Sequence, residues 1–148
     1  MAEPSVTSDA FEHGDRMPDR HTLEGDNLSP SLTWSEVPEE ATSVALICED
    51  PDAPSGTFVH WVAWGLDPRA GGLGEGEAPP KQGQNDFGHA GYDGPAPPPG
   101  HGPHRYFFRF YALESEPDLE PGASREDLLA AIEDGVLATA EHMGTYER

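Results

Sequence analysis

The stretch GPAPPPGHGPHRYFFRFYAL, Gly94 to Leu113, changes character halfway along its length. Its first half is rich in Gly and Pro, which favour neither a helix nor a central strand. From His104 onward it is dense in aromatic residues, which favour strands. A strand entered through a stiff loop is a common way to build a pocket wall, so the neighbouring strands decide whether a pocket forms beside it.

Two further segments have the same short, apolar, turn-bounded character, namely Thr42–Asp50 and Thr57–Trp64, and Leu32–Trp34 is a weaker strand. One helix is expected after Ser124, with Asp127 completing a capping box, apolar residues every four positions as far as Val136, and Gly135 near its end. Residues 136–146 fit a helix or a strand equally well. Mostly strands with one helix predict a single domain, residues 1–148, built as an antiparallel sandwich with a helical appendage.

Alternation along the three main strands assigns one shared face to each. The predicted faces are Val44, Leu46, Cys48 and Asp50; Phe58, His60, Val62 and Trp64; and His104, Tyr106, Phe108 and Phe110. Each apolar row carries a polar group at or near one end, beside a Pro/Gly loop, as expected of a pocket mouth. A lone His on an apolar face is more often a core residue, but three such coincidences favour a shared site. Arg105 and Arg109 lie on the opposite face and are expected in surface ion pairs.

These residue types are compatible with several chemistries. Two His and an Asp can ligate zinc, but no His-x₃-His or His-Glu-x-x-His spacing is present. A hydrolase needs a nucleophile, but there is no Gly-x-Ser-x-Gly elbow, and Ser55 reads as a turn residue. Two imidazoles, the Tyr106 hydroxyl and loop amides suit a small anion, with donor or protonated His supplying positive potential.

The charge balance is extreme, with 28 Asp and Glu against 8 Lys and Arg, a formal net charge of −20. The acids are spread along the chain and predict a solvated surface adapted to high salt, as in a halophile. This charge argues against binding to nucleic acid or to an anionic membrane. No apolar run approaches the length of a membrane span, and the acidic N-terminus does not resemble a signal peptide. With Cys48 as the only cysteine, we expect a cytoplasmic protein.

Seven segments together resemble the phosphatidylethanolamine-binding protein family, and most closely its bacterial and archaeal Raf-kinase-inhibitor-like branch. They are Cys48–Pro54, His60–Trp61, Gly94–Pro98, His104–Tyr106, Asp26–Pro30, Gln84–Gly88 and Met143–Tyr146. The resemblance covers nearly the whole chain, from about Phe11 to Arg148. It implies two antiparallel sheets packed face to face with short helices at the side, and it favours a strand after Gly135.

The resemblance also implies a pocket for a phosphate or similar small anion. Carried over by position, its residues are Asp50 and Asp52 from the turn, His60 from the second strand, Pro97 and Pro98 from the rigid loop, and His104 and Tyr106 from the third strand. Members with a helix over the pocket extend beyond the position of Arg148, so a more open pocket is expected here. Kinase inhibition, known for animal members, does not transfer to this chain.

The sequence therefore predicts a non-enzymatic protein that binds a phosphate-like group, such as a phospholipid head group, with a regulatory role. The alternatives are a kinase or protease inhibitor acting through surface loops such as Arg69–Gln84, and a hydrolase that uses a His–Asp pair. Neither a cofactor nor a metal is expected. The expected ligand is a small anion, any protein partner is unidentified, and the protein is expected to be a monomer or a homodimer.

Overall fold

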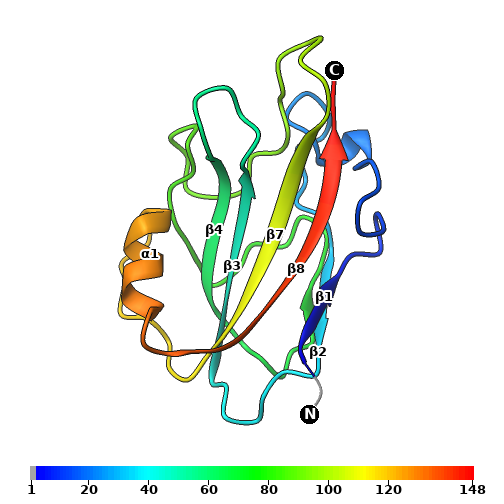
Figure 1. Cartoon of the computed structure of the whole chain (residues 1–148). Helices are drawn as coiled ribbons and strands as arrows, with labels where there is room; N and C mark the ends of the chain where they lie inside the picture. Colours follow the sequence, from blue (N-terminus) through cyan, green and yellow to red (C-terminus); the bar gives the residue numbers. More distant parts are fainter. Residues whose placement is uncertain (1–2) are drawn as a thin grey trace.

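The computed structural model describes residues 3–148, which form two antiparallel sheets (Figure 1). The smaller sheet has the order β1 (Ser5–Thr7), β2 (Leu32–Ser35), β5 (Gly72–Leu73). The larger has the order β6 (Lys81–Gln82), β4 (Phe58–Leu66), β3 (Ser43–Asp50), β7 (His104–Leu113), β8 (Val136–Tyr146). The helices are a single 3₁₀ turn, η1 (Asp19–His21), and α1 (Arg125–Ile132). The mainly β fold class predicted from the sequence is confirmed.

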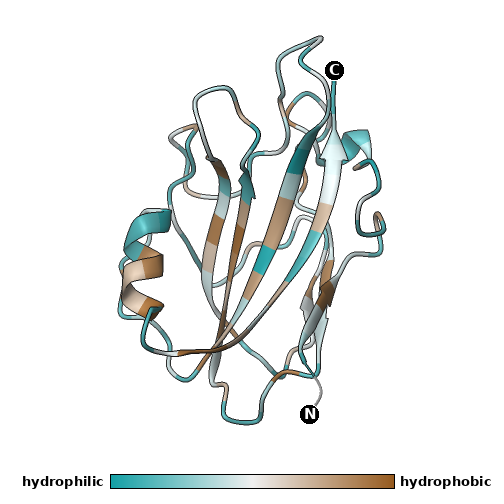
Figure 2. Cartoon of the chain, viewed as in Figure 1, coloured by the Kyte–Doolittle hydropathy of each residue, from teal (hydrophilic) through white to brown (hydrophobic). Residues whose placement is uncertain are grey.

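The core has two parts, one on each face of the larger sheet. Between the sheets, residues such as Leu46, Trp61 and Phe108 pack against Trp34 of β2. On the other face, Ile47 and Trp64 pack against residues of α1, Leu128 and Ile132. Figure 2 shows the corresponding apolar stretches along β3, β4 and β7 and in the later turns of α1. Because β3 is covered on both faces, all eight of its residues are buried.

The helix is capped as predicted but ends earlier. The Ser124 hydroxyl accepts a hydrogen bond from the Asp127 amide, and the Asp127 carboxylate accepts one from the Ser124 amide. The helical residues stop at Ile132, so Val136 does not continue the helix's apolar repeat. It begins β8 instead, which pairs along the whole of β7. The ambiguous segment 136–146 is therefore a strand, because β7 offers it a complete hydrogen-bonding edge.

The predicted face of β4 is wrong beyond His60. Cys48 pairs with Trp61 and Glu49 with Val59, so His60 is an extra residue without a partner on β3, as in a β-bulge. The bulge shifts the alternation by one position. Phe58 and His60 face the end of the core between the sheets, whereas Val62 and Trp64 face α1. Strict alternation, which held for β3 and β7, could not anticipate this inserted residue.

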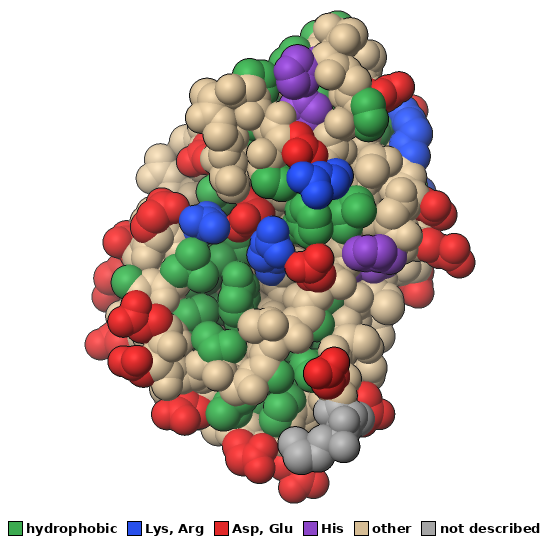
Figure 3. All heavy atoms as spheres, in the orientation of Figure 1, with side chains coloured by type: hydrophobic (Ala, Val, Ile, Leu, Met, Phe, Trp, Pro, Cys, Tyr) green, Lys and Arg blue, Asp and Glu red, His purple; other side chains and the backbone are tan. Residues whose placement is uncertain are grey.

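The larger sheet's exposed side carries the expected ion pairs. Arg105 pairs with Asp52, and Arg109 with Glu141 and Glu49. Figure 3 shows a few basic groups gathered at the middle of this face and acidic side chains scattered around its outline. Within residues 3–148, no helix is long and apolar enough to cross a membrane.

Candidate functional site

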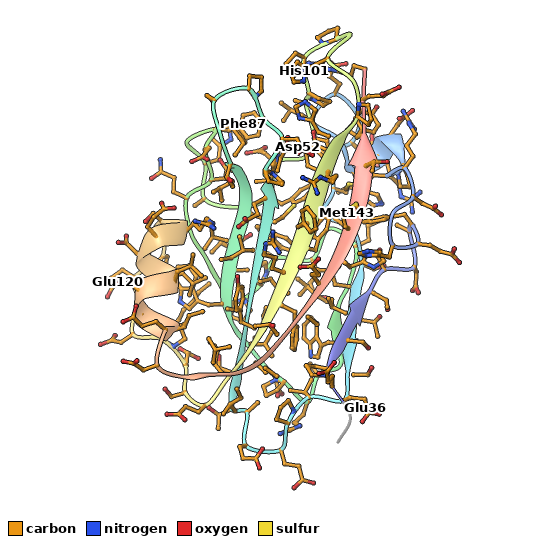
Figure 4. The ribbon with its side chains drawn as sticks, in the orientation of Figure 1. Glu36, Asp52, Phe87, His101, Glu120 and Met143 are labelled. Carbon is orange, nitrogen blue, oxygen red and sulfur yellow. The ribbon has the colours of Figure 1, made fainter. Side chains whose placement is uncertain are left out.

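A cavity of about 250 Å³ opens where β3, β4 and β7 meet the Pro/Gly loop, near the labelled Phe87 and His101 in Figure 4. Its walls are Asp50, Ala53, Pro54, Ser55, Phe58, His60, Phe87, Ala96, Pro97, Pro98, His104 and Tyr106. Most of these side chains are apolar, and a few polar groups converge among them, as in small-molecule sites generally. The volume is slightly below the range typical of drug-sized ligands, so the cavity suits a small group.

Asp50 and His104 form a buried pair at the end of β3 and β7. The Nδ1 of His104 donates to Oδ2 of Asp50 over 2.7 Å, and both side chains are almost fully buried. The other carboxylate oxygen, Oδ1, accepts the amide of Asp52 at 2.7 Å. Because Nδ1 is committed to the carboxylate, Nε2 is the ring nitrogen of His104 that is left for other partners.

Tyr106 places a neutral hydroxyl in the same cavity. Its ring packs edge-on against His60, with centroids 5.3 Å apart. Burial, and after it the negative charge of Asp50, raises the pKa of Tyr106 well above its ordinary value. The phenol therefore stays protonated and can donate a hydrogen bond at any physiological pH.

His60 has the opposite hydrogen-bonding character to the one expected. Its Nδ1 donates to the carbonyl of Asp93 over 2.7 Å, and burial lowers its pKa below the ordinary value. The neutral tautomer then carries a lone pair on Nε2. We expected both pocket histidines to act as donors or cations, but the free nitrogen of neutral His60 is an acceptor.

Asp93 holds His60 in place and was not predicted as part of the site. Its carboxylate accepts hydrogen bonds from Asn27 and Asn85, each at 2.8 Å, and from His89. Burial opposes ionisation, but these hydrogen bonds outweigh it and lower the pKa of Asp93. Asn27 and Asn85 belong to two of the segments that carried the family resemblance, which was the available signal for this support.

Phe87 is a wall residue that sequence reasoning did not assign to the site. Its ring packs against Phe58, with centroids 4.8 Å apart, and against His60 at 5.6 Å. It follows Asn85, whose side-chain oxygen accepts the Phe87 amide. Phe87 lies in a turn rather than a strand, so strand alternation could not point to it.

Asp52 lies outside the cavity, unlike the other predicted site residues. Two guanidinium nitrogens of Arg105 donate to its two carboxylate oxygens, each over 2.9 Å, and the Arg105 amide donates as well. The hydrogen bond from the Arg105 side chain is the main reason that the pKa of Asp52 falls to about 2. Asp52 therefore ties the turn after β3 to β7, while Asp50, His60, Pro97, Pro98, His104 and Tyr106 line the pocket.

Arg148 fastens the proline loop to the end of β8. Its Nε donates to the carbonyl of Pro97 over 2.6 Å, and its own carbonyl accepts the amide of Gly100 at 2.9 Å. Its guanidinium also pairs with Glu24. The prolines restrict the loop in the unfolded chain too, so less order has to be imposed when a ligand binds.

The sequence matches the family model for phosphatidylethanolamine-binding proteins over residues 7–147. The chain belongs to this family. A UPF0098 protein of Methanothermobacter thermautotrophicus is 50% identical, over 97% of this chain and 99% of the relative. A UPF0098 protein of Aquifex aeolicus is 45% identical, over 97% of this chain and 88% of the relative.

Two crystal structures of family members share the fold. A putative phosphatidylethanolamine-binding protein homologue from Chlamydia trachomatis has a TM-score of 0.94 and 40% identity, covering 100% of this chain and 99% of its own. YbcL of E. coli, described as a new member of the mammalian family, has a TM-score of 0.93 and 35% identity, covering 99% of each chain. These similarities extend over both sheets and the loops that form the pocket.

Zinc is expected to be unnecessary for stability. Within residues 3–148, no group of three or more His, Cys, Asp or Glu side chains is arranged to hold a metal ion. Treatment with a chelator should leave the thermal midpoint unchanged, as measured by circular dichroism. A large drop in the midpoint would instead indicate a structural metal, since metal binding contributes directly to the folding free energy.

Proposed function

We propose that this family member binds a small phosphate-like group in the pocket and acts as a binding or regulatory protein rather than an enzyme. The supporting observation is the convergence of three polar groups, the Asp50–His104 pair, Tyr106 and His60, on one small, largely apolar cavity. In this proposal the Tyr106 hydroxyl donates a hydrogen bond to the anion. His104 donates a second one when its Nε2 is protonated. The carboxylate of Asp50 balances the charge of a protonated His104, so the pair as a whole is not repulsive to an anion.

His60 makes the proposal more specific. Its Nε2 is an acceptor in the neutral ring, so the ligand needs one hydrogen-bond donor on the side that faces it. Hydrogen phosphate and a monoprotonated phosphomonoester carry such an O–H, whereas sulfate at neutral pH does not. A buried acceptor left without its donor costs binding free energy, so the site should distinguish the two anions.

Titration with phosphate should move the side-chain NMR signals of His60 and His104 together. We expect weak binding, and sulfate should bind at least about threefold more weakly because it leaves His60 unpaired. The ring signal of His13, which accepts a hydrogen bond from the Met143 amide, serves as the internal control. Binding in which the two pocket signals stay still would contradict the proposed site, and equal affinity for sulfate would contradict the acceptor role of His60.

A hydrolase is the second candidate, because the Asp50–His104 pair has the geometry that orients a general base and Ser55 lines the same cavity. Within residues 3–148, however, no hydrogen bond joins Ser55 to either histidine. Release of a chromogenic alcohol from a phosphate or carboxylic ester, lost in Ser55→Ala, would favour this candidate. Inhibition of a kinase or protease through the 69–84 loop remains a third proposal, tested by adding the protein to such an enzyme.

We further propose that the protein belongs to the Raf-kinase-inhibitor-like branch and works in the cytoplasm of a salt-accumulating organism as a monomer or homodimer. The net charge of −20 supports the salt adaptation and argues against nucleic acid as a partner. Sedimentation in molar salt would decide between the two oligomeric states.

A further inference from the structure

His101, which does not line the cavity, makes a close contact with the pocket histidine. Its Nδ1 lies 2.7 Å from Nε2 of His104, and the two rings meet edge to face with centroids 4.8 Å apart. His101 is exposed in the loop, whereas His104 is buried. Figure 4 shows His101 in the loop above the ends of the strands. The contact therefore joins a surface side chain to the nitrogen that the proposed function assigns to the ligand.

The hydrogen-bonding inventory of this contact limits what His104 can do. Its Nδ1 carries a proton because Asp50 accepts there, so two nitrogens, Nε2 of His104 and Nδ1 of His101, share a single proton. In either arrangement, Nε2 of His104 is occupied. An anion can use an N–H at this position only after the contact with His101 has been broken.

We propose that His101 is a cap on His104 that competes with the ligand and swings away when an anion binds. The proposal rests on the proposed function, because it assumes that an anion uses Nε2 of His104. His101 then sets the affinity and the selectivity of the site without belonging to its walls. A ligand gains the contact with His104 only by replacing the hydrogen bond that His101 makes in the free protein.

The loop around His101 permits this movement. The flanking Gly100 and Gly102 have φ angles of 76° and 91°, and a Cβ at either position would meet no atom within 4 Å. Within the described residues, His104 is the only hydrogen-bond partner of the His101 ring. Two backbone hydrogen bonds fix the loop next to the ring. The His101 amide donates to the Pro98 carbonyl, and the Gly100 amide donates to the Arg148 carbonyl. Rotation of the side chain thus needs no unfolding of the loop.

Two substitutions separate a cap from other roles. His101→Ala removes the cap, and the affinity for phosphate should rise by roughly two- to tenfold, the range expected for one net hydrogen bond. His101→Asn keeps a short donor near the position of Nδ1 and should bind phosphate about as weakly as the original protein. His13→Ala is the control for removal of an exposed imidazole. Affinities are measured by NMR titration with inorganic phosphate at one pH and one salt concentration, after thermal melts have confirmed that each variant is folded.

The free proteins give a second readout. Without phosphate, the side-chain ¹⁵N signal of His104 Nε2 should shift in His101→Ala but stay close to its original position in His101→Asn and His13→Ala. An unchanged signal in His101→Ala would show that the cap is not formed and would overturn the proposal. A general effect on folding would not reproduce this pattern.

The titrations distinguish the possible failures. If the original protein binds phosphate and His101→Ala binds it equally or more weakly, the cap is wrong while the proposed function stands. Weaker binding would mean that His101 helps to hold the anion instead of competing with it. If phosphate binds to none of these proteins, the proposed function is wrong and the cap is overturned with it.

Discussion

In dilute buffer the protein is expected to unfold, or to melt at least about 10 °C below its thermal midpoint in molar KCl. Charge repulsion of a few kcal/mol is enough to lower the midpoint of a protein of this size by that amount. The surplus of 20 negative charges is spread over a chain of only 148 residues. The Debye length is about 30 Å at about 0.01 M salt and about 3 Å at about 1 M. For this chain length the radius of gyration is about 15 Å, so in dilute buffer most charges repel one another across the whole molecule.

The structure shows why internal ion pairs do not cancel this repulsion. Arg16, Arg20, Lys81, Arg105, Arg109, Arg125 and Arg148 all pair with acidic side chains. The eighth basic residue, Arg69, binds backbone carbonyls, including those of Pro38 and Glu39. The basic side chains of residues 3–148 are therefore already used, while 20 of the 28 acidic side chains form no ion pair with Lys or Arg there. Salt weakens the exposed pairs, each worth at most about 1 kcal/mol, but relieves the larger collective repulsion.

Thermal melts across a series of KCl concentrations at fixed pH test this prediction. A matched series in sucrose is the control, because sucrose favours compact states by exclusion from the surface but does not screen charge. We expect KCl to raise the midpoint steeply and sucrose to raise it only slightly. A midpoint that does not depend on KCl would contradict the salt adaptation, and the localisation proposed with it, without affecting the fold or the pocket.

Much of the fold was predictable because its determinants are local. The strands β3, β4 and β7 are apolar runs bounded by Pro or Gly, and the capping box of α1 needs only Ser124 and Asp127. The end of α1 and the strand β8 were not decided by local pattern. Residues 136–146 become a strand because β7 offers them a partner, and pairing between distant segments leaves little trace in a short window of sequence.

The site, too, was predictable where its determinants are local and not where they depend on tertiary contacts. Alternation brought Asp50, His104 and Tyr106 to one face, and it failed after His60 because a bulge inserts one residue. Asp52 lies outside the cavity and binds Arg105 of β7. This contact joins residues that are distant in the sequence, so the turn alone does not predict it. The link between His101 and His104 spans only three residues, yet it lies in a loop with two glycines at positive φ angles, where strand alternation does not apply. Residue types thus indicated the chemistry, whereas loop geometry decided which atoms remain free.

The Gly94→Ala substitution is expected to destabilise the protein by about 3 kcal/mol or more, lowering the thermal midpoint by about 6–12 °C. Gly94 lies where the loop leading to the prolines crosses the segment that contains His21. A Cβ built on Gly94 would lie 2.0 Å from the His21 carbonyl oxygen and 2.9 Å from Thr22 Cα. These are backbone atoms, so no side-chain rotation relieves the overlap. The same His21 oxygen accepts the Tyr92 hydroxyl, and the Pro95 carbonyl accepts the Leu23 amide, so the two segments cannot separate without losing hydrogen bonds.

The displacement would also reach the pocket, because the carbonyl of Asp93, the residue before Gly94, holds Nδ1 of His60. We therefore expect Gly94→Ala to weaken phosphate binding as well as to lower the midpoint. Gly122→Ala is the matched control in a turn that does not line the pocket, since a Cβ there meets no atom within 4 Å and the cost is only that of a positive φ angle, about 1–2 kcal/mol. Thermal melts and phosphate titrations of both variants make the comparison. If Gly94→Ala were as stable as Gly122→Ala, the close approach of the two backbones would not be what holds the loop in place.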